Sequence, residues 1–398
     1  MKIGIYGGTF DPPHLGHMEA ARASVAALGL DKLIFMPAKQ PPHKPLPAVS
    51  AAPEQRMAMT ELMADGLLLP GVTEVSALEL ERPGKSYTSD TLRKLKERFP
   101  EDELWLLMGT DMFLTLQDWH ESGQIMALAG IAAFARAKGD SGERMEAQGK
   151  YLSDAYGARV RIIQLPEIHE ISSTQVRRQG TGEGLWPPVW GYILRQGLYG
   201  VSSDLKGLTD ADLRAVSYSM IRAKRIAHVK GTEEEAVRLA RRWGADEEYA
   251  RRAAILHDCT KYLELDEQLA LCAQYGVELD DMERGAVKLL HSKTGSALAR
   301  YVFGEPEEVW QAICWHTTGK ADMTLLEKIL YIADYMEPTR DFEGVEKLRA
   351  LAYVDLDAAV LLGTEMSVEE MQQRGNLIHP NTLAARDCLL RASDKKLE

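Results

Sequence analysis

The sequence predicts an α/β domain built on a doubly wound parallel sheet, followed by an all-helical domain. Six short β-rich runs alternate with helical patterns in the first half of the chain, and after about residue 208 long helical periods replace them. Alternating strands and helices indicate a parallel sheet, whereas apolar residues at helical spacing indicate packed helices. The length of 398 residues also suits two domains better than one.

The expected strands are short and apolar, and glycine, proline or charged residues bound each of them. They cover residues 2–6, 32–38, 73–80, 103–109, 131–136 and 159–165. Helical patterns between several of them cover residues 18–28, 53–63 and 89–98. This is the order of βα units in a parallel sheet.

The second half shows only helical patterns, at residues 210–228, 232–243, 246–257, 325–335 and 354–373. A segment with glycine and serine, residues 197–204, separates the two halves and has the composition of a linker. We place the boundary near residue 203 and expect domains at residues 1–203 and 204–398.

Composition excludes several classes of protein. The net charge of −12 disfavours nucleic acid or an anionic membrane surface as the main partner. The longest strongly apolar stretch, residues 125–135, is far shorter than the roughly 20 residues of a membrane span, and the chain begins without a signal-peptide pattern. The four cysteines lack C-x-x-C spacing, as expected of reduced thiols. We therefore expect a cytoplasmic protein.

A glycine-rich turn follows the first expected strand and leads into a helical pattern. It reads G-G-T-F-D-P-P-H-L-G-H over residues 7–17 and includes His14 and His17. Free N–H groups and the helix dipole at such a helix start favour an anion, and imidazoles can donate hydrogen bonds to phosphate oxygens. The spacing is neither G-x-G-x-x-G nor that of a P-loop. Residue type, spacing and context favour a phosphate site over a turn that merely caps a helix.

Together with four later motifs, this turn resembles the bacterial nicotinate mononucleotide adenylyltransferases of the H-x-G-H nucleotidyltransferase superfamily. The later motifs are P-A-K-Q-P-P-H-K at residues 37–44, S-Y-T-S-D-T-L at 86–92, G-T-D at 109–111 with Trp119, and I-S-S-T-Q-V-R at 171–177. They cover the whole first half. The resemblance implies a Rossmann-like fold for this domain.

In that family the phosphate of an acid substrate attacks the α-phosphorus of ATP in line and releases pyrophosphate. The resemblance implies ATP and nicotinate mononucleotide as substrates, with Mg²⁺ held mainly by the triphosphate and water. The residues that it assigns to catalysis are His14, His17, Lys44 and Arg177. The residues that it assigns to substrate binding are Gly8, Thr9, Phe10, Tyr87, Thr88, Asp111, Trp119, Ser172 and Ser173.

One position departs from the family pattern. Many relatives carry a second tryptophan three residues after the first, and Ser122 stands there in this chain. The choice between an acid and an amide substrate therefore stays open, and Trp119 could itself be a core aromatic. The alternative activity is adenylylation of another phosphorylated cofactor precursor, against which residues 41–44 and 87–92 argue.

Six side chains of metal-ligand type occur at ordered positions in the helical half. They are His228, His257, Asp258, His291, His316 and Asp334. Each has apolar helical flanks, which implies a site in the core of the bundle, and each interval allows a helix and a return. Any one of these histidines alone would be taken as structural, but the ordered set predicts a site for divalent transition metals.

The surrounding residues resemble the HD-domain phosphohydrolases, and in particular the bacterial HD proteins that split dinucleoside tetraphosphates symmetrically. The matching segments are L-H-D-C-T-K at 256–261, H-T-T-G at 316–319 and I-A-D-Y-M-E-P-T-R at 332–340. The resemblance implies diadenosine tetraphosphate as substrate and two divalent metals, with iron as the native ion. The implied ligands are His228, His257, Asp258 and Asp334 for one metal, and His291, His316 and the bridging, catalytic Asp258 for the other.

Further polar residues of this half carry weaker signals. Lys261 and Arg340 are expected to contact phosphate, although either could be a solvated surface charge, and His379 is expected to be structural. The alternatives to tetraphosphate hydrolysis are hydrolysis of another nucleotide and a regulatory module that senses nucleotides without cleaving them. The intact ligand set argues against the sensing module. The sequence does not distinguish a monomer from a homo-oligomer.

Overall fold

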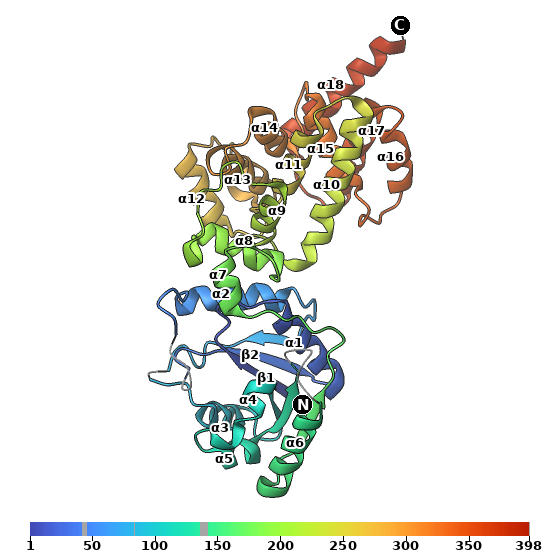
Figure 1. Cartoon of the computed structure of the whole chain (residues 1–398). Helices are drawn as coiled ribbons and strands as arrows, with labels where there is room; N and C mark the ends of the chain where they lie inside the picture. Colours follow the sequence, from blue (N-terminus) through green and yellow to red (C-terminus); the bar gives the residue numbers. More distant parts are fainter. Residues whose placement is uncertain (42–45, 83, 136–141, 398) are drawn as a thin grey trace. The chain divides into compact units, whose positions relative to one another are not determined.

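The computed structural model describes residues 1–41, 46–82, 84–135 and 142–397. The chain divides into two compact units, Met1–Ser203 and Asp204–Glu398 (Figure 1). The first contains a sheet covered by helices, and the second is helical.

The first unit is built on a six-stranded sheet in the order β3-β2-β1-β4-β5-β6, in which every strand pair is parallel. The strands are β1 (Lys2–Gly8), β2 (Lys32–Pro37), β3 (Thr73–Val75), β4 (Glu103–Gly109), β5 (Gly130–Phe134) and β6 (Val160–Ile163). The direction of strand order reverses between β1 and β4, and sheets of this kind bind ligands there, beyond the carboxyl ends of the strands. The predicted doubly wound parallel sheet is confirmed.

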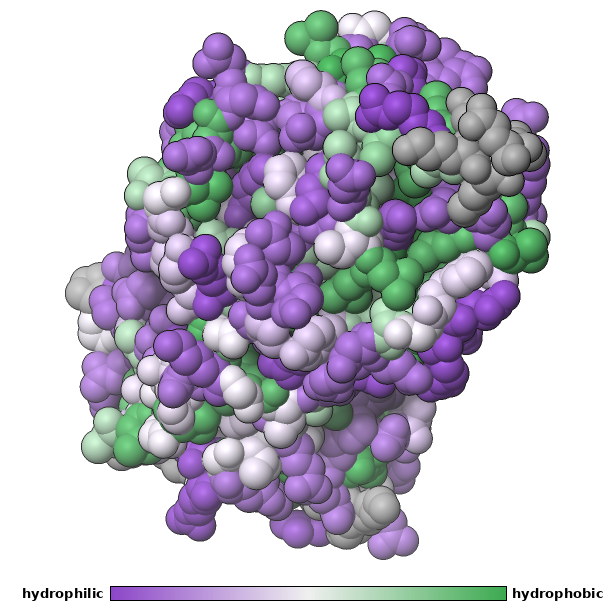
Figure 2. Space-filling view, turned by 90° about the horizontal axis from the view of Figure 1, so that it is seen from above, coloured by the Kyte–Doolittle hydropathy of each residue, from purple (hydrophilic) through white to green (hydrophobic). Residues whose placement is uncertain are grey.

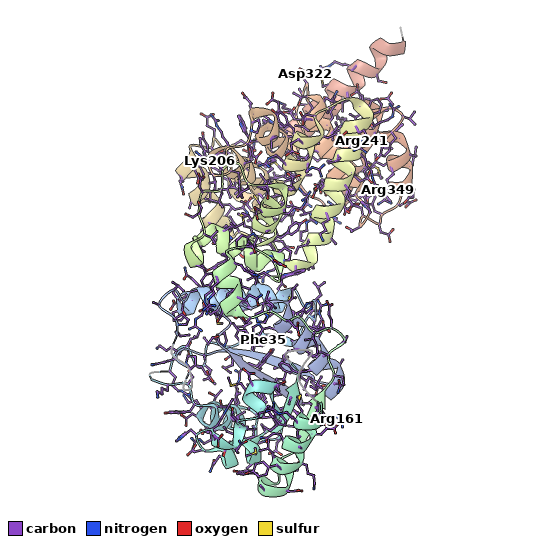
Figure 3. All side chains as sticks on the ribbon, in the orientation of Figure 1. Phe35, Arg161, Lys206, Arg241, Asp322 and Arg349 are labelled. Atoms are coloured by element: carbon purple, nitrogen blue, oxygen red, sulfur yellow. The ribbon has the colours of Figure 1, made fainter. Side chains whose placement is uncertain are left out.

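Helices cover both faces of this sheet because its strands are apolar on both sides. Ile3 and Ile5 enter one buried core, whereas Tyr6 enters the other. The fully buried Phe35, labelled in Figure 3, lies in the same core as Tyr6. The helices are α1 (Leu15–Leu28), α2 (Pro53–Asp65), α3 (Thr88–Arg98), α4 (Thr110–Phe113), α5 (Ser122–Leu128), α6 (Gly142–Tyr156), α7 (Ser173–Gln179) and α8 (Pro187–Gln196). Short 3-10 helices lie at Leu116–Asp118 and Leu198–Gly200.

The strand expected at residues 73–80 is wrong in its second half, because β3 ends at Val75. The N–H of Ser76 still reaches β2, at 2.9 Å from the main-chain oxygen of Phe35. The N–H of Leu78 then donates to Oγ of Ser76 at 3.3 Å, so a local side-chain bond replaces the next strand pairing. The chain turns away here and leaves β3 a three-residue edge strand.

The second unit consists of packed helices, and residues 204–397 contain no strand. The helices are α9 (Asp210–Tyr218), α10 (Ala223–Trp243), α11 (Glu247–Leu256), α12 (Leu265–Tyr275), α13 (Val287–Tyr301), α14 (Glu307–Trp315), α15 (Leu325–Met336), α16 (Val345–Ala352), α17 (Leu356–Gln373) and α18 (Pro380–Leu397). A 3-10 helix lies at Glu283–Gly285. Helix α10 packs against α11 and α15, and α14 packs against α11, α13 and α15.

The helix expected at residues 210–228 is two helices. Helix α9 ends at Tyr218, and α10 begins at Ala223 after an extended Arg222. Ser219 contributes to the break, because its hydroxyl donates to the main-chain oxygen of Val216 at 2.6 Å instead of facing solvent. Residues 232–243, which we expected to form a separate helix, are the second half of α10.

The surface that Figure 2 presents is mostly hydrophilic, with apolar residues in small groups. In the described part of the chain, no helix has both the length and the apolar character needed to span a membrane. All four cysteines are free thiols, and Cys259 and Cys272 are buried.

Candidate functional sites

The first candidate site lies beyond the carboxyl end of β1, where the chain enters α1. His14 precedes the helix with extended backbone (φ −139°, ψ 172°), and its N–H donates to Nδ1 of His17 at 3.2 Å. Because Nδ1 accepts this bond, the proton of a neutral His17 ring is on Nε2. His17 thereby has a ring N–H with which it can donate to a phosphate oxygen.

Packing fixes the ring of His17, which is 9% exposed. Its centroid lies 5.1 Å from the ring of the buried Phe10 and 3.8 Å from the ring of His14. A Cβ atom on Gly16 would lie 3.1 Å from Nδ1 of His14 and 3.5 Å from the main-chain oxygen of His169. A side chain at position 16 would therefore press on the ring of His14.

Helix α7 joins this site from the far end of the unit. Ser173, the first residue of α7, donates from Oγ to the main-chain oxygen of Pro12 at 2.8 Å. Arg177 donates to the main-chain oxygen of Asp11, and its Nη1 lies 3.4 Å from Oδ2 of the same residue. Ser172 caps the helix by accepting from the N–H of Gln175 at 3.2 Å. Ser173 and Arg177 thus lie at the glycine-rich turn, as the motifs suggested.

The carboxyl ends of β1 and β4 bring two further predicted groups to one edge of the sheet. Gly8 ends β1 and Thr9 follows it, while Asp111 lies in the first turn of α4 directly after β4. The two strands are hydrogen-bonded neighbours, so their ends adjoin. The exposed Asp111 is therefore placed at the switch point of the sheet. Lys44 lies outside the described residues.

Three of the residues that the resemblance assigns to substrate binding, Tyr87, Thr88 and Trp119, gather around α3 and α5, which pack together. Tyr87 caps α3, Thr88 begins it, and both are half-buried. The ring of Tyr87 lies 4.5 Å from the ring of the exposed His120, whereas Trp119 is half-buried against the core. His120 was not among the predicted residues, and its only sequence signal is its position next to Trp119.

Ser122 stands where many relatives have a second tryptophan, and it begins α5. Its Oγ donates to the main-chain oxygen of Gln117 at 3.0 Å. At this position the chain has a small hydroxyl that closes a turn in place of a second indole ring.

The second candidate site is a buried cluster of the six predicted metal ligands. Helix α10 supplies His228, the end of α11 supplies His257 and Asp258, α13 supplies His291, the end of α14 supplies His316, and α15 supplies Asp334. Nε2 of His228 lies 3.0 Å from Oδ1 of Asp334 and 3.3 Å from Nε2 of His257. The structure brings all six together from five helices.

Asp258 lies between two groups of ligands. Its Oδ2 is 3.5 Å from Nε2 of His257, and its Oδ1 is 3.2 Å from Nε2 of His291, which lies 3.1 Å from Nε2 of His316. Within each trio, His228-His257-Asp258 and Asp258-His291-His316, the ligand atoms lie within 4.8 Å of one another. A carboxylate shared by two trios is the arrangement expected of a bridge between two metals.

The hydrogen bonds around the cluster fit a cation. The Nδ1 atoms of His257 and His316 each lie 2.7 Å from a main-chain oxygen, and Nδ1 of His228 lies 3.0 Å from Oε1 of Glu337. These acceptors place the ring protons on Nδ1, so the Nε2 lone pairs face one another and the carboxylates. The buried Oδ1 of Asp258 lies 3.2 Å from Nε2 of His291 and 3.2 Å from Nζ of Lys261, without a well-aligned hydrogen bond to either. Imidazole nitrogens and carboxylate oxygens whose lone pairs converge in this way are typical ligands of a transition metal.

The pKa shifts of His291, His316 and Asp258 agree with metal ligation, whereas for His228 burial lowers the pKa but hydrogen bonds with Asp334 and Glu337 outweigh it and raise that pKa. Burial lowers the pKa of His316 well below its ordinary value and also lowers the pKa of His291, which keeps these rings neutral. Burial opposes ionisation of Asp258, but His257, His291 and Lys261 outweigh it and hold the pKa of the carboxyl well below its usual range. Neutral imidazoles and an ionised carboxylate are the forms that bind metal.

Three cationic side chains reach the carboxylates of the cluster. Lys261 Nζ lies 3.2 Å from Oδ1 of Asp258, and Arg340 Nη2 lies 2.9 Å from Oδ1 of Asp334. Arg225, which we did not predict, lies 2.7 Å from Oδ2 of Asp258 through Nε. Its sequence signal is its position one helical turn before His228.

Glu337 is a second residue of the helical unit, after Arg225, that the sequence analysis missed. It is fully buried, and it accepts from the N–H of Thr339 at 2.7 Å and from the Thr339 hydroxyl as well as from His228. Its signal was its place within I-A-D-Y-M-E-P-T-R, one turn after Asp334.

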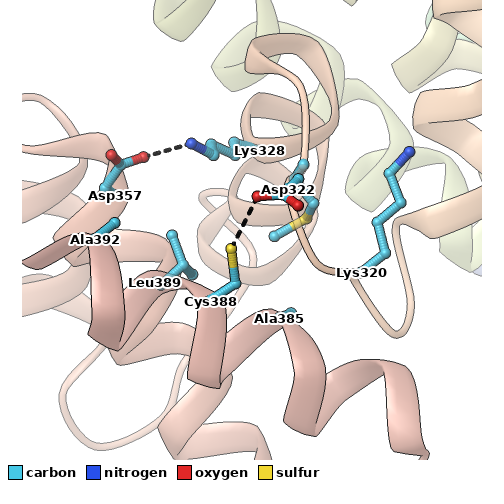
Figure 4. A pocket seen from close by; sticks show the side chains of 9 residues that line it. Lys320, Asp322, Lys328, Asp357, Ala385, Cys388, Leu389 and Ala392 are labelled. Atoms are coloured by element: carbon cyan, nitrogen blue, oxygen red, sulfur yellow. Dashed lines mark hydrogen bonds and ion pairs between the residues drawn. The ribbon is translucent and has the colours of Figure 1, made fainter.

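Two other polar sites in this unit lie outside the cluster. Nδ1 of His379 accepts from the N–H of Asn381 at 3.2 Å, so its Nε2 carries the proton and lies 2.9 Å from Oδ2 of Asp280, which is the arrangement of a structural histidine. A cavity of about 250 Å³ adjoins α15 and α18 (Figure 4). Four of its polar side chains pair with one another, since Lys328 pairs with Asp357 at 2.7 Å and Cys388 lies 3.2 Å from Asp322. The fifth, Lys320, pairs with Glu327 at 2.9 Å.

The fold and these two sites define an α/β unit of nucleotidyltransferase type joined to a helical unit with a metal-ligand cluster. The family model for cytidylyltransferase-like proteins matches residues 5–179, and that for the HD domain matches residues 225–339. The second unit therefore carries an HD domain.

The curated relatives match about half of this chain over nearly their whole own length. A "Probable nicotinate-nucleotide adenylyltransferase" of Neisseria meningitidis is 38% identical over 203 residues, which cover 50% of this chain and 98% of that protein. One of the same name from Thermus thermophilus is 39% identical over 204 residues and is covered completely. Through this half, the chain belongs to the nicotinate-nucleotide adenylyltransferase family.

Two solved structures are also similar. One, from Clostridium acetobutylicum, is described as a predicted HD superfamily hydrolase involved in NAD metabolism; it shares 38% identity, with 46% of this chain and 98% of that chain covered and a TM-score of 0.45. The other, a nicotinic acid mononucleotide adenylyltransferase from Plasmodium falciparum, shares 19% identity, with 51% and 98% covered and a TM-score of 0.41.

Proposed function

We propose that the first unit transfers the adenylyl group of ATP to nicotinate mononucleotide. A phosphate oxygen of the mononucleotide forms a bond to the α-phosphorus of ATP, the bond from that phosphorus to the bridging oxygen breaks, and deamido-NAD and pyrophosphate leave. ATP enters with Mg²⁺ on its phosphates. The observation that carries this proposal is the His14–His17 pair at the start of α1, with the tautomer of His17 set by a main-chain donor.

The side chains of this unit position and neutralise, and the reaction needs no covalent enzyme intermediate. His17 donates from Nε2 to the phosphate on which charge develops, and His14 adds a second donor beside it. Arg177 and Ser173 hold α7 against the same turn, and Lys44 contributes a further positive charge. Tyr87, Thr88 and Trp119 bind the pyridine ring, for which an aromatic face is suited. We expect Gly8, Thr9, Asp111 and Ser172 to lie along the substrate path, whereas the ring of Phe10 is buried against His17 and supports it from the core.

Product analysis tests this proposal. The full chain with ATP and nicotinate mononucleotide should release deamido-NAD and pyrophosphate in equal amounts. Nicotinamide mononucleotide serves as the matched substrate that differs only in its amide, and the ratio of the two rates measures acid preference in the presence of Ser122. If the chain consumes neither, adenylylation of another phosphorylated cofactor precursor becomes the better account.

We infer that the HD unit hydrolyses diadenosine tetraphosphate symmetrically to two ADP. The shared carboxylate of Asp258 between two ligand trios supports this. His228, His257, Asp258 and Asp334 would hold one divalent metal, and Asp258, His291 and His316 the other. When bound, such a pair supplies Lewis acidity at a phosphate and an activated water for in-line attack, and we propose iron as the native metal.

The other residues of this unit prepare the site for a polyphosphate. Lys261, Arg340 and Arg225 place three cations at the ligand carboxylates, where they can neutralise a phosphate chain that enters the cluster. Burial of the imidazoles keeps bulk water from their ring nitrogens. With this activity and that of the first unit, the chain would be a bifunctional cytoplasmic enzyme.

Metal analysis combined with product identification tests the second activity. Protein reconstituted with Fe²⁺ or Mn²⁺ should hold two ions per chain and release only ADP from diadenosine tetraphosphate, whereas asymmetric cleavage would give ATP and AMP. A different nucleotide substrate would leave the tetraphosphate intact but be cleaved itself in a screen of nucleotides. Binding of nucleotides without any turnover would favour the sensing module.

A further inference from the structure

The buried side chain of Asp11 binds groups from several segments of the first unit. The residue is 1% exposed, and its Oδ1 accepts from the N–H of Ala51 at 3.0 Å and from the hydroxyl of Tyr199 at 2.7 Å. Arg177 reaches the same residue from α7, at its main-chain oxygen and at Oδ2. Three segments that are distant in sequence thus meet on one side chain, three residues before His14.

Arg56 also holds the loop after β1, through main-chain oxygens. This side chain is completely buried, and its Nη1 donates to the main-chain oxygens of Thr9 at 2.9 Å and Ala38 at 2.6 Å. The loop after β1 is therefore fastened to the loop after β2 through Arg56 and to the last residues of the unit through Tyr199.

Tyr199 has an unusual backbone conformation for a tyrosine. Its φ of 58° and ψ of 27° lie in the left-handed region, which a residue with a Cβ adopts only when its surroundings require it. The residue lies beyond the stretch 5–179 that the family model matches. Burial and the adjacent Asp11 raise the pKa of its hydroxyl, so it stays a hydrogen-bond donor. The hydroxyl of Tyr199 thus donates to the carboxylate of Asp11, which lies 188 positions earlier in the chain.

We propose that Tyr199 is a positioning residue for adenylyl transfer: its hydroxyl holds Asp11, and Asp11 holds the loop that carries His14 and His17 against α7. The proposal rests on the function inferred for this unit. Tyr199 itself need not touch substrate. Loss of its hydroxyl should let the loop move relative to Arg177 and lower the fraction of bound substrate that is aligned for attack.

Tyr199→Phe removes only the oxygen, and Tyr192→Phe is the matched control because Tyr192 packs against the same core. In full-length protein at a temperature where circular dichroism shows both variants folded, Tyr199→Phe should lower kcat about tenfold to a hundredfold, the range expected when a catalytic group is misplaced by about an ångström. KM for ATP should change much less, and Tyr192→Phe should behave as wild type. Unchanged kcat in Tyr199→Phe would overturn the proposal.

Amide hydrogen exchange tests, without any substrate, whether the Tyr199 hydroxyl holds Asp11 and its loop in place. Peptides that contain Ala51, or residues 173–179 of α7 with Arg177, should exchange faster in Tyr199→Phe than in wild type, and at the wild-type rate in Tyr192→Phe. If wild type fails to make deamido-NAD but exchange increases as described, the proposed reaction is wrong while the positioning contact stands. Exchange that is equal in all three proteins would show that the hydroxyl holds nothing in place and would overturn the proposal.

Discussion

Nδ1 of His228 lies 3.0 Å from Oε1 of the buried Glu337, which is 109 positions later in the chain. The carboxylate binds the ring nitrogen that faces away from the other ligands and so orients Nε2 toward Asp334 and His257. Burial opposes ionisation of Glu337, but its hydrogen bonds with His228 and Thr339 lower its pKa overall. A carboxylate behind a metal-ligating histidine fixes both the tautomer and the direction of the ring.

Glu337→Ala should therefore weaken metal binding about tenfold to a hundredfold although Glu337 is not itself among the proposed ligands. Metal content after dialysis against buffered Mn²⁺ would measure this. Glu343→Ala, at an exposed position in the same segment, is the control and should bind as wild type. An unchanged affinity in Glu337→Ala would mean that packing alone orients His228.

Glu79 gives the first unit a pH-dependent stability. Burial raises the pKa of this carboxyl to about 7, against the hydrogen bond that it accepts from Thr91 at 2.6 Å. Below about pH 4.5 both the folded and unfolded states are protonated and the residue costs nothing. Between about pH 4.5 and pH 7 the carboxyl ionises in the unfolded state but stays protonated in the folded state, so the free energy of unfolding falls as pH rises. Above about pH 7 both states are ionised and the loss levels off.

Glu79→Gln should remove this pH-dependent decrease in the free energy of unfolding. Between pH 5 and pH 8 the free energy of unfolding of the variant should rise relative to wild type by about 2 to 3 kcal/mol. Urea unfolding at the two pH values measures the difference, and the exposed Glu81→Gln is the control. A stability difference that is the same at both pH values would contradict a raised pKa.

The first unit should function when it is expressed alone. Residues 1–203 form a compact unit with their own sheet and two buried cores, and the glycine-rich turn, α7 and Tyr199 all belong to it. The fragment should be soluble and should form deamido-NAD at a rate near that of the full chain. An inactive or insoluble fragment, with an active full chain as control, would show that the second unit is needed for folding.

Local pattern sufficed for the sheet, because strands buried on both faces are continuous apolar runs such as that at residues 103–109. The same pattern predicted wrong ends of elements where a side chain redirects the backbone. Ser76 ends β3 early, and Ser219 helps to break the expected helix between Tyr218 and Ala223. Hydroxyls that bond to nearby main-chain groups compete with regular structure, and apolar periodicity does not register them.

The clustered histidines and aspartates could be predicted as a group because such residues are rare in apolar helical flanks, whereas the residues that hold them or the glycine-rich turn in place could not. Glu337, Arg225 and Tyr199 are of types common on protein surfaces. Each acts through one contact across a long sequence separation, such as the 188 positions between Asp11 and Tyr199. Only the tertiary structure shows which of many similar residues makes such a contact.

Two variants measured against both reactions test the central claim that one chain carries two independent active sites. His17→Ala should lower adenylyl transfer about a hundredfold or more, equivalent to about 2 to 4 kcal/mol, and leave tetraphosphate hydrolysis and metal content unchanged. Asp258→Ala should lose hydrolysis and metal but keep full adenylyl transfer. Wild-type transfer in folded His17→Ala, or two metal ions per chain in Asp258→Ala, would contradict the account.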